Sequence, residues 1–154
     1  GVKANLARAP QGGDTDQLKG LISGECDIAL ANTYYFARAL RDPPVEGLSE
    51  SLASIGWVFP NQETTGAHIN ISVAGVAAHA PNRDNAIRFL EYLASDQAQE
   101  YFSSGNDEFP AVEGTVLSPN VAALGEFRAD DLNLSALGEY QAAAERIYND
   151  TGWE

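Results

Sequence analysis

An apolar run that stops at the start of a capped helix constrains the fold of this chain more than any other feature. Residues 28–31 (Ile-Ala-Leu-Ala) have the length and composition of a short buried strand. Asn32 or Thr33 is a good N-cap, and residues 36–40 continue with helix-forming side chains. The junction therefore predicts a strand that leads directly into a helix.

The rest of the chain repeats this alternation, and we expect an α/β fold. Further strands or extended segments are expected near Leu6 and at residues 57–60, 68–76 and 109–112. Helices are expected at residues 14–23, 48–53, 82–93 and 95–102 and from Leu134 onward, with a break at residues 41–47. The first of these helices should be capped by Asp14 or Thr15 and should end at Gly24.

Two of the expected helices carry apolar residues at helical spacing, and we expect those faces to be buried. The residues are Ala86, Phe89, Leu90 and Leu93 in one helix, and Leu137, Tyr140, Ala144, Ile147 and Tyr148 in the other.

Two adjacent phenols, Tyr34 and Tyr35, fall in the first turn of the helix that follows residues 28–31. Successive side chains on a helix diverge by about 100°, so two neighbouring phenols converge only beyond the helix end. The free N–H groups of the first turn attract anions there. Phenolate and carboxylate oxygens are hard donors that suit Fe³⁺. Adjacent tyrosines at a helix start are also common as half-buried packing residues, and the local pattern leaves that alternative open.

Composition narrows the possible partners. The 154 residues carry nine Lys and Arg against 22 Asp and Glu, a formal charge of −13. Such a balance disfavours binding to nucleic acid and to anionic membrane surfaces. No apolar run reaches the roughly 20 residues that a membrane-spanning helix needs. The single cysteine, Cys26, excludes an intramolecular disulfide and is expected to be a small buried residue.

Four segments together resemble the periplasmic ferric-ion-binding proteins of bacterial iron ABC importers: residues 4–17, 24–35, 66–76 and 85–93. In that family a Tyr-Tyr pair supplies two iron ligands, which the resemblance carries over to Tyr34 and Tyr35. It implies a non-enzymatic protein outside the cytoplasm that delivers Fe³⁺ to an ABC permease in the inner membrane.

The resemblance also implies groups around the metal. Relatives balance the charge of Fe³⁺ with a synergistic anion, carbonate or phosphate, or with further anionic side chains. Where phosphate-using members have an asparagine, this chain has Gly13 followed by Asp14, a departure that argues against a phosphate-dependent site. Asn32 and Thr33 are candidate neighbours of the metal or anion, and both are equally well explained as helix caps.

The family is similar to type II periplasmic binding proteins, which have two lobes, and this chain resembles only the C-terminal half. The remaining iron ligands would then come from an N-terminal half outside this sequence. By analogy, residues 1–65 belong to the C-terminal lobe, 66–114 contain hinge strands and part of the N-terminal lobe, and 115–154 return with a closing helix. Residues 68–76 and 108–112 are the hinge candidates.

Two alternatives remain open on the sequence. The same fold could bind another small solute, such as an oxyanion or an organic ligand. A hydrolase could use Cys26 or His68 as nucleophile or base. His68 and His79 are eleven residues apart, which matches no metal-ligand spacing, and Asp14-Thr15-Asp16 lacks the rest of a calcium loop.

Overall fold

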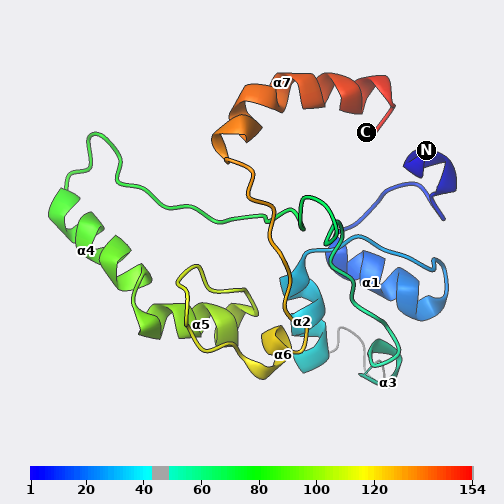
Figure 1. The fold of residues 1–154 in the computed structure, drawn as a ribbon, viewed down its shortest axis with the longest axis horizontal. Helices are drawn as coiled ribbons and strands as arrows, with labels where there is room; N and C mark the ends of the chain where they lie inside the picture. The colour runs from blue at the N-terminus through cyan, green and yellow to red at the C-terminus, as the bar shows by residue number, and fades with distance from the viewer. Residues whose placement is uncertain (43–48, 154) are drawn as a thin grey trace. The chain divides into compact units, whose positions relative to one another are not determined.

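The computed structural model describes residues 1–42 and 49–153, and its regular structure is helical (Figure 1). The elements are η1 (Val2–Asn5), α1 (Asp14–Ser23), α2 (Thr33–Arg41), α3 (Ser49–Leu52), α4 (Arg83–Leu93), α5 (Asp96–Asn106), α6 (Pro119–Ala122) and α7 (Ser135–Asp150). Within the described ranges, no helix has both the length and the apolarity needed to cross a membrane.

The chain divides into two compact units. The larger comprises Gly1–Val58 and Asn70–Glu126, and the smaller comprises Phe59–Ile69 and Phe127–Glu154. The lobe boundaries expected from the resemblance, 1–65, 66–114 and 115–154, stay a prediction. The expected break at residues 41–47 and the first residue of the expected helix at 48–53 fall largely outside the described residues; α3 accounts for the rest of that helix.

The core of the larger unit surrounds α2, which packs against α1, α3 and α6 (Figure 1). Its buried apolar side chains come from every one of these helices, from α5 and from the turn after α6: Leu18, Phe36, Ala37, Ala39, Leu52, Ala98, Val121 and Leu124. Phe36 also stacks on Trp57, with ring centroids 5.3 Å apart. One side of α2 is therefore fixed by packing, while its first turn stays at the margin of the core.

The helix starts follow the expected chemistry with one shift in position. The N-cap of α1 is Gly13, and not Asp14 or Thr15, because the carboxylate of Asp16 reaches back to accept the Gly13 N–H at 3.0 Å. Gly24 ends α1 as expected, at φ 73°. Ser95 caps α5 by accepting the N–H of Ala98.

The strands of the expected α/β alternation are not borne out among the described residues. Residues 28–31, 57–60 and 68–76 form no ladder there, and Leu6 only follows η1 in extended conformation. The one pairing recorded is an isolated parallel bridge between Ala67 and Ala129. A strand is defined by its backbone partner, and these extended segments have no neighbouring strand in the described chain.

The burial expected for two helical faces is also wrong. No residue of α4 or α7 is buried, and Phe89, Tyr140 and Ile147 are 58%, 61% and 64% exposed. The helical spacing was read correctly, but periodicity does not say whether a second surface is present to cover the apolar face.

The smaller unit is held by contacts between its two segments. Phe59 stacks on Phe127 with centroids 4.2 Å apart, and the side-chain amide of Gln62 bonds both the N–H and the carbonyl of Arg128. Gly66 has φ 93°, and a Cβ at this position would lie 2.6 Å from the carbonyl oxygen of Ala129. Only glycine fits this close approach without movement of the backbone.

Candidate metal centre

Tyr34 and Tyr35 are the second and third residues of α2 and lie side by side. Their ring centroids are 4.4 Å apart and the ring planes are inclined at 35°. Both side chains are half-buried, so the rings neither point apart nor disappear into packed hydrocarbon. The pair stays open to a ligand at the N-terminal end of α2.

The surroundings of Tyr34 favour the neutral phenol. Its pKa is raised above the ordinary value of 10.0, first by the side-chain hydrogen bond with Tyr35, then by burial, and then by the negative charges of Tyr35, Asp14 and Glu108. A phenol in such a place ionises at neutral pH only when a cation takes over the oxygen. A trivalent ion is strong enough to displace that proton.

Asp14 begins α1 and is hydrogen-bonded to the residue that precedes α2. Its Oδ1 accepts the backbone N–H of Asn32 at 2.6 Å and the Nδ2 of the same residue at 3.2 Å. Asn32 is the N-cap of α2 by backbone conformation, but its side chain makes no capping bond. Instead that side chain accepts a bond from Asn70 Nδ2 at 3.5 Å.

The other two residues expected near the site have structural positions. Gly13 is the N-cap of α1, and its N–H is occupied by Asp16. Thr33 is the first residue of α2 and is half-buried. The structure thus brings Asp14, Asn32, Tyr34 and Tyr35 together, while the roles expected for Gly13 and Thr33 stay predictions.

A cation also lies against the phenols. The guanidinium carbon of Arg38 is 5.8 Å from the ring centroid of Tyr34 and 5.8 Å from that of Tyr35. Arg38 donates to the carbonyl of Asn106 at 3.4 Å, and Arg41 donates to that of Ser104 at 3.1 Å. These arginines tie α2 to the C-terminal end of α5, where the helix dipole favours positive charge.

Asp107 completes this anchor. It is 1% exposed, has φ 61°, and its Oδ2 lies 2.9 Å from Arg41 Nη1 and 3.9 Å from Arg38 Nε. Both contacts are ion pairs without the alignment of a hydrogen bond. The next residue, Glu108, returns its N–H to the carbonyl of Phe102 at 3.2 Å. The end of α5 therefore fixes the backbone of Glu108, whose negative charge helps to raise the pKa of Tyr34.

Two buried polar residues of α5 hold the segment that follows this helix. Gln99 Oε1 accepts the N–H groups of Ala111 and Val112, and Gln99 Nε2 donates to the carbonyl of Leu93. Ser103 Oγ accepts the N–H of Ser118 at 2.7 Å. Because every such bond is internal, these groups serve the loop and not a ligand.

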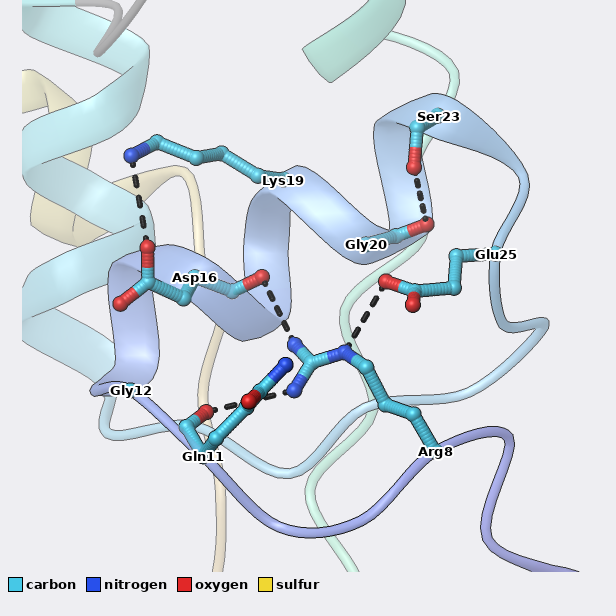
Figure 2. Close-up of a pocket in the computed structure, with 8 residues that line it drawn as sticks. All are labelled: Arg8, Gln11, Gly12, Asp16, Lys19, Gly20, Ser23 and Glu25. Atoms are coloured by element: carbon cyan, nitrogen blue, oxygen red, sulfur yellow. Dashed lines mark hydrogen bonds and ion pairs between the residues drawn. The ribbon is translucent and has the colours of Figure 1, made fainter.

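An open hollow of about 490 Å³ beside α1 does not include the phenols. Figure 2 shows Arg8 at its centre, 3.0 Å from Glu25 and within hydrogen-bond distance of the carbonyls of Gln11 and Asp16. Lys19 faces Asp16 at 3.4 Å. The charged groups of the hollow thus pair with one another and brace the loop that leads to Asp14.

The residues considered for other chemistry are not assembled into a site. Cys26 is half-buried, and His68 and His79 are exposed. Across residues 1–42 and 49–153, no three His, Cys, Asp or Glu side chains gather in a way that could hold a metal ion.

Sequence reasoning missed Arg38, Asn70 and Glu108. Arg38 could have been found, because residues three and four positions apart share a helix face and this arginine follows both tyrosines at that spacing. Asn70 and Glu108 are brought in by long-range folding, and nothing in the local sequence signals it.

Comparison with known proteins finds relatives in iron uptake. No family model matches. The chain is 44% identical over 158 residues to Iron uptake protein A2 of Synechocystis, covering 100% of this chain and 45% of that protein. Apo FutA2 from Synechocystis PCC6803 matches with a TM-score of 0.89 and 42% identity, over 99% of this chain and 49% of that one.

A second solved structure, Trichodesmium IdiA (FutA) in complex with iron and citrate ligands, matches with a TM-score of 0.88 and 42% identity, over 97% of this chain and 47% of that one. The resemblance to ferric-ion-binding proteins is thereby confirmed, since the curated relative is named an iron uptake protein and the second solved structure contains iron. The chain spans about half the length of each relative it matches.

Proposed function

We propose that this chain is the iron-holding C-terminal half of a solute-binding protein that delivers Fe³⁺ to an ABC permease. The observation that supports it best is the pair of phenol rings 4.4 Å apart at the start of α2. Tyr34 and Tyr35 are the proposed ligands. Their position at a half-buried helix start leaves the oxygens within reach of an ion held against the larger unit.

The electrostatics of the site suit a trivalent cation. Asp14 and Glu108 place negative charge close enough to raise the pKa of Tyr34, and that same charge favours a metal ion in the phenol's proton position. Two phenolates leave one positive charge on Fe³⁺, so a further anionic group is needed. The Trichodesmium structure, which has a similar fold, is a complex with iron and citrate ligands.

The finer features of the fold belong to the same proposal. We infer a type II periplasmic-binding-protein fold, in which the extended residues 28–31 and 68–76 pair with strands of the N-terminal half. Ile28, Leu30 and Val73 are 88%, 90% and 83% exposed, and both faces of residues 28–31 are apolar, as in strands of a parallel sheet. That half would also supply the remaining iron ligands. We propose that the protein acts in the periplasm or another extracytoplasmic space.

Absorption spectroscopy tests the proposed ligands. Fe³⁺ supplied as a weak chelate to the complete protein should produce a visible phenolate-to-iron charge-transfer band. Tyr34→Phe and Tyr35→Phe should each weaken the band and the double variant should abolish it, whereas Tyr101→Phe, at a 66% exposed tyrosine, should change nothing. An unaltered band in the double variant would reject the assignment. Sulfate and polyamines in place of iron would reveal a different solute.

A further inference from the structure

We propose that Arg8 is a positioning residue of the iron site: its guanidinium holds the start of α1 in the place from which Asp14 fixes the start of α2. This inference rests on the proposed function of Tyr34 and Tyr35. Arg8 is not one of the proposed ligands, so it would act on iron binding only through the helices that place them.

The guanidinium of Arg8 is bonded through each of its three nitrogens (Figure 2). Nε contacts Glu25 Oε2 at 3.0 Å, and Nη1 donates to the carbonyl of Gln11 at 3.3 Å. Nη2 donates to the carbonyl of Asp16 at 3.4 Å and to Gln17 Oε1 at 3.3 Å. The planar fork of a guanidinium suits partners spread in this way, whereas the ammonium of a lysine is a single point. One side chain, 21% exposed, thus joins the loop before α1, the first turn of α1 and the residue after its C-cap.

Further contacts hold the loop before α1 close to the first turn of that helix. Gln17 Nε2 donates to the carbonyl of Gln11 at 3.0 Å and to that of Gly13 at 3.3 Å. Gly12 has φ 72°, and a Cβ there would lie 2.8 Å from Asp16 Cβ, so a larger residue would have to displace the Asp16 side chain. The loop and the helix start therefore form one braced unit, and the guanidinium is bonded to both parts of it.

The braced unit ends at the carboxylate that fixes the start of α2. Asp14 is the first residue of α1, and its Oδ1 accepts the backbone N–H of Asn32 at 2.6 Å and Nδ2 of the same residue at 3.2 Å. Tyr34 and Tyr35 follow within one helical turn, and the N–H of Tyr35 bonds the carbonyl of Asn32 at 3.2 Å. A displacement of the start of α1 would therefore reach the phenols through hydrogen bonds alone.

Arg8→Lys tests this role in the complete protein, because lysine keeps the positive charge and cannot make all the bonds of the fork. Fe³⁺ affinity is measured through the charge-transfer band, with iron supplied as a weak chelate. Loss of a group that orients metal ligands typically lowers metal affinity by about 10- to 100-fold, and we expect a loss of about tenfold. Glu25→Gln is the matched control, since it removes the ion pair of Arg8 and leaves the bonds to α1 in place. It should change the affinity by less than about twofold.

Gln17→Leu removes the second polar link of the braced unit without a change of charge. Iron affinity should fall by about threefold, as expected for the loss of internal hydrogen bonds, and this variant decides the inference if Arg8→Lys does not fold. Amide hydrogen exchange at Asn32, measured without iron, should be faster in both variants and unaltered in Glu25→Gln. A role in stability alone would speed exchange throughout the larger unit and would not single out Asn32.

Unaltered iron affinity in Arg8→Lys and Gln17→Leu would overturn the inference. An equal loss of affinity in Glu25→Gln would also overturn it, and so would exchange at Asn32 that is as slow in the variants as in the unsubstituted protein. In each of these cases the unsubstituted protein still binds iron and the proposed function stands. Absence of the band in every protein, the unsubstituted one included, would instead reject the proposed function and the inference with it.

Discussion

Arg41 contacts two carboxylates at the same distance, and burial should decide which of them stabilises the fold. Its Nη1 lies 2.9 Å from Asp107 Oδ2, and its Nε lies 2.9 Å from Asp42 Oδ2. The side chain of Asp107 is 1% exposed and that of Asp42 is 72% exposed. Replacing each by asparagine keeps the size of the side chain, removes its charge and makes the same chemical change at both positions.

The magnitude follows from the two environments. Unit charges 2.9 Å apart attract by roughly 6 kcal/mol at an effective dielectric constant of about 20, and desolvation of Asp107 offsets part of this. Removing one partner of a fully buried pair costs about 3–5 kcal/mol, but water reaches Arg38 and Arg41, which are 44% and 35% exposed. We therefore expect Asp107→Asn to lower the free energy of unfolding by about 2 kcal/mol. Asp42→Asn should lower it by less than about 0.5 kcal/mol.

Urea unfolding followed by far-UV circular dichroism measures both values, and thermal unfolding should show a drop of about 4–8 °C for Asp107→Asn in a domain of this size. The hydrogen bond to Asp42 raises the pKa of Arg41 more than the charge of Asp107 does, but an arginine is protonated in any case, so this does not alter the ranking. Asparagine also tolerates the positive φ of position 107, which excludes backbone strain as the cause. Equal losses of stability for the two substitutions would refute the argument from burial.

Three further predictions concern the phenols, the smaller unit and the extended segments. Because the folded protein raises the pKa of Tyr34, the absorbance of its phenolate should appear above pH 10. The stabilisation that this shift gives is complete below the pKa of the unfolded state and is lost as the pH rises through the pKa of the folded state. Iron binding must displace the phenol proton, so it should weaken as the pH falls. Gly66→Ala should destabilise the protein by about 1–3 kcal/mol in thermal unfolding, whereas Gly56→Ala, where a Cβ meets nothing within 4 Å, should be nearly neutral. If residues 68–76 pair with the N-terminal half, Val73→Lys should weaken co-purification of the two halves expressed as separate chains. Val116→Lys is the control, because Val116 is equally apolar and 70% exposed, and it should leave co-purification unchanged. Loss of co-purification in both variants would argue for a general effect of added charge.

The sequence predicted α1 to α5 and α7 because their signals are local, and it did not predict η1 or α6. Gly24 ends α1, Asn32 begins α2 and Ser95 caps α5, and each boundary depends on residues within one turn of it. The same reasoning put the cap of α1 one or two residues late. Asp16 decides that boundary by bonding Gly13, and a reciprocal bond of this kind competes with capping by Asp14 or Thr15.

The candidate site was predictable only in its local part. Tyr34 and Tyr35 are adjacent in the chain and fall in the first turn of α2, so their placement at one helix start follows from the local sequence. The bond from Asp14 to Asn32 joins residues 18 apart, and its geometry depends on how α1 packs on α2. Glu108 reaches the same place through the end of α5. Such contacts follow from tertiary packing, which propensity and periodicity do not encode.

The failures on strands and on buried faces share a physical cause. Residues 28–31 and 68–76 have the composition of strands, and α4 and α7 have apolar faces. A hydrophobic pattern shows that a segment could be buried, but it does not show that another surface is present to bury it. Ile28 at 88% exposed and Ile147 at 64% lie in different units, so a local rearrangement of one unit would not bury both. Exposure of this kind costs about 25 cal/mol for each Å² of apolar surface that stays in water. The N-terminal half proposed above would add strands and helical faces, and it would also supply the further iron ligands that the proposal needs.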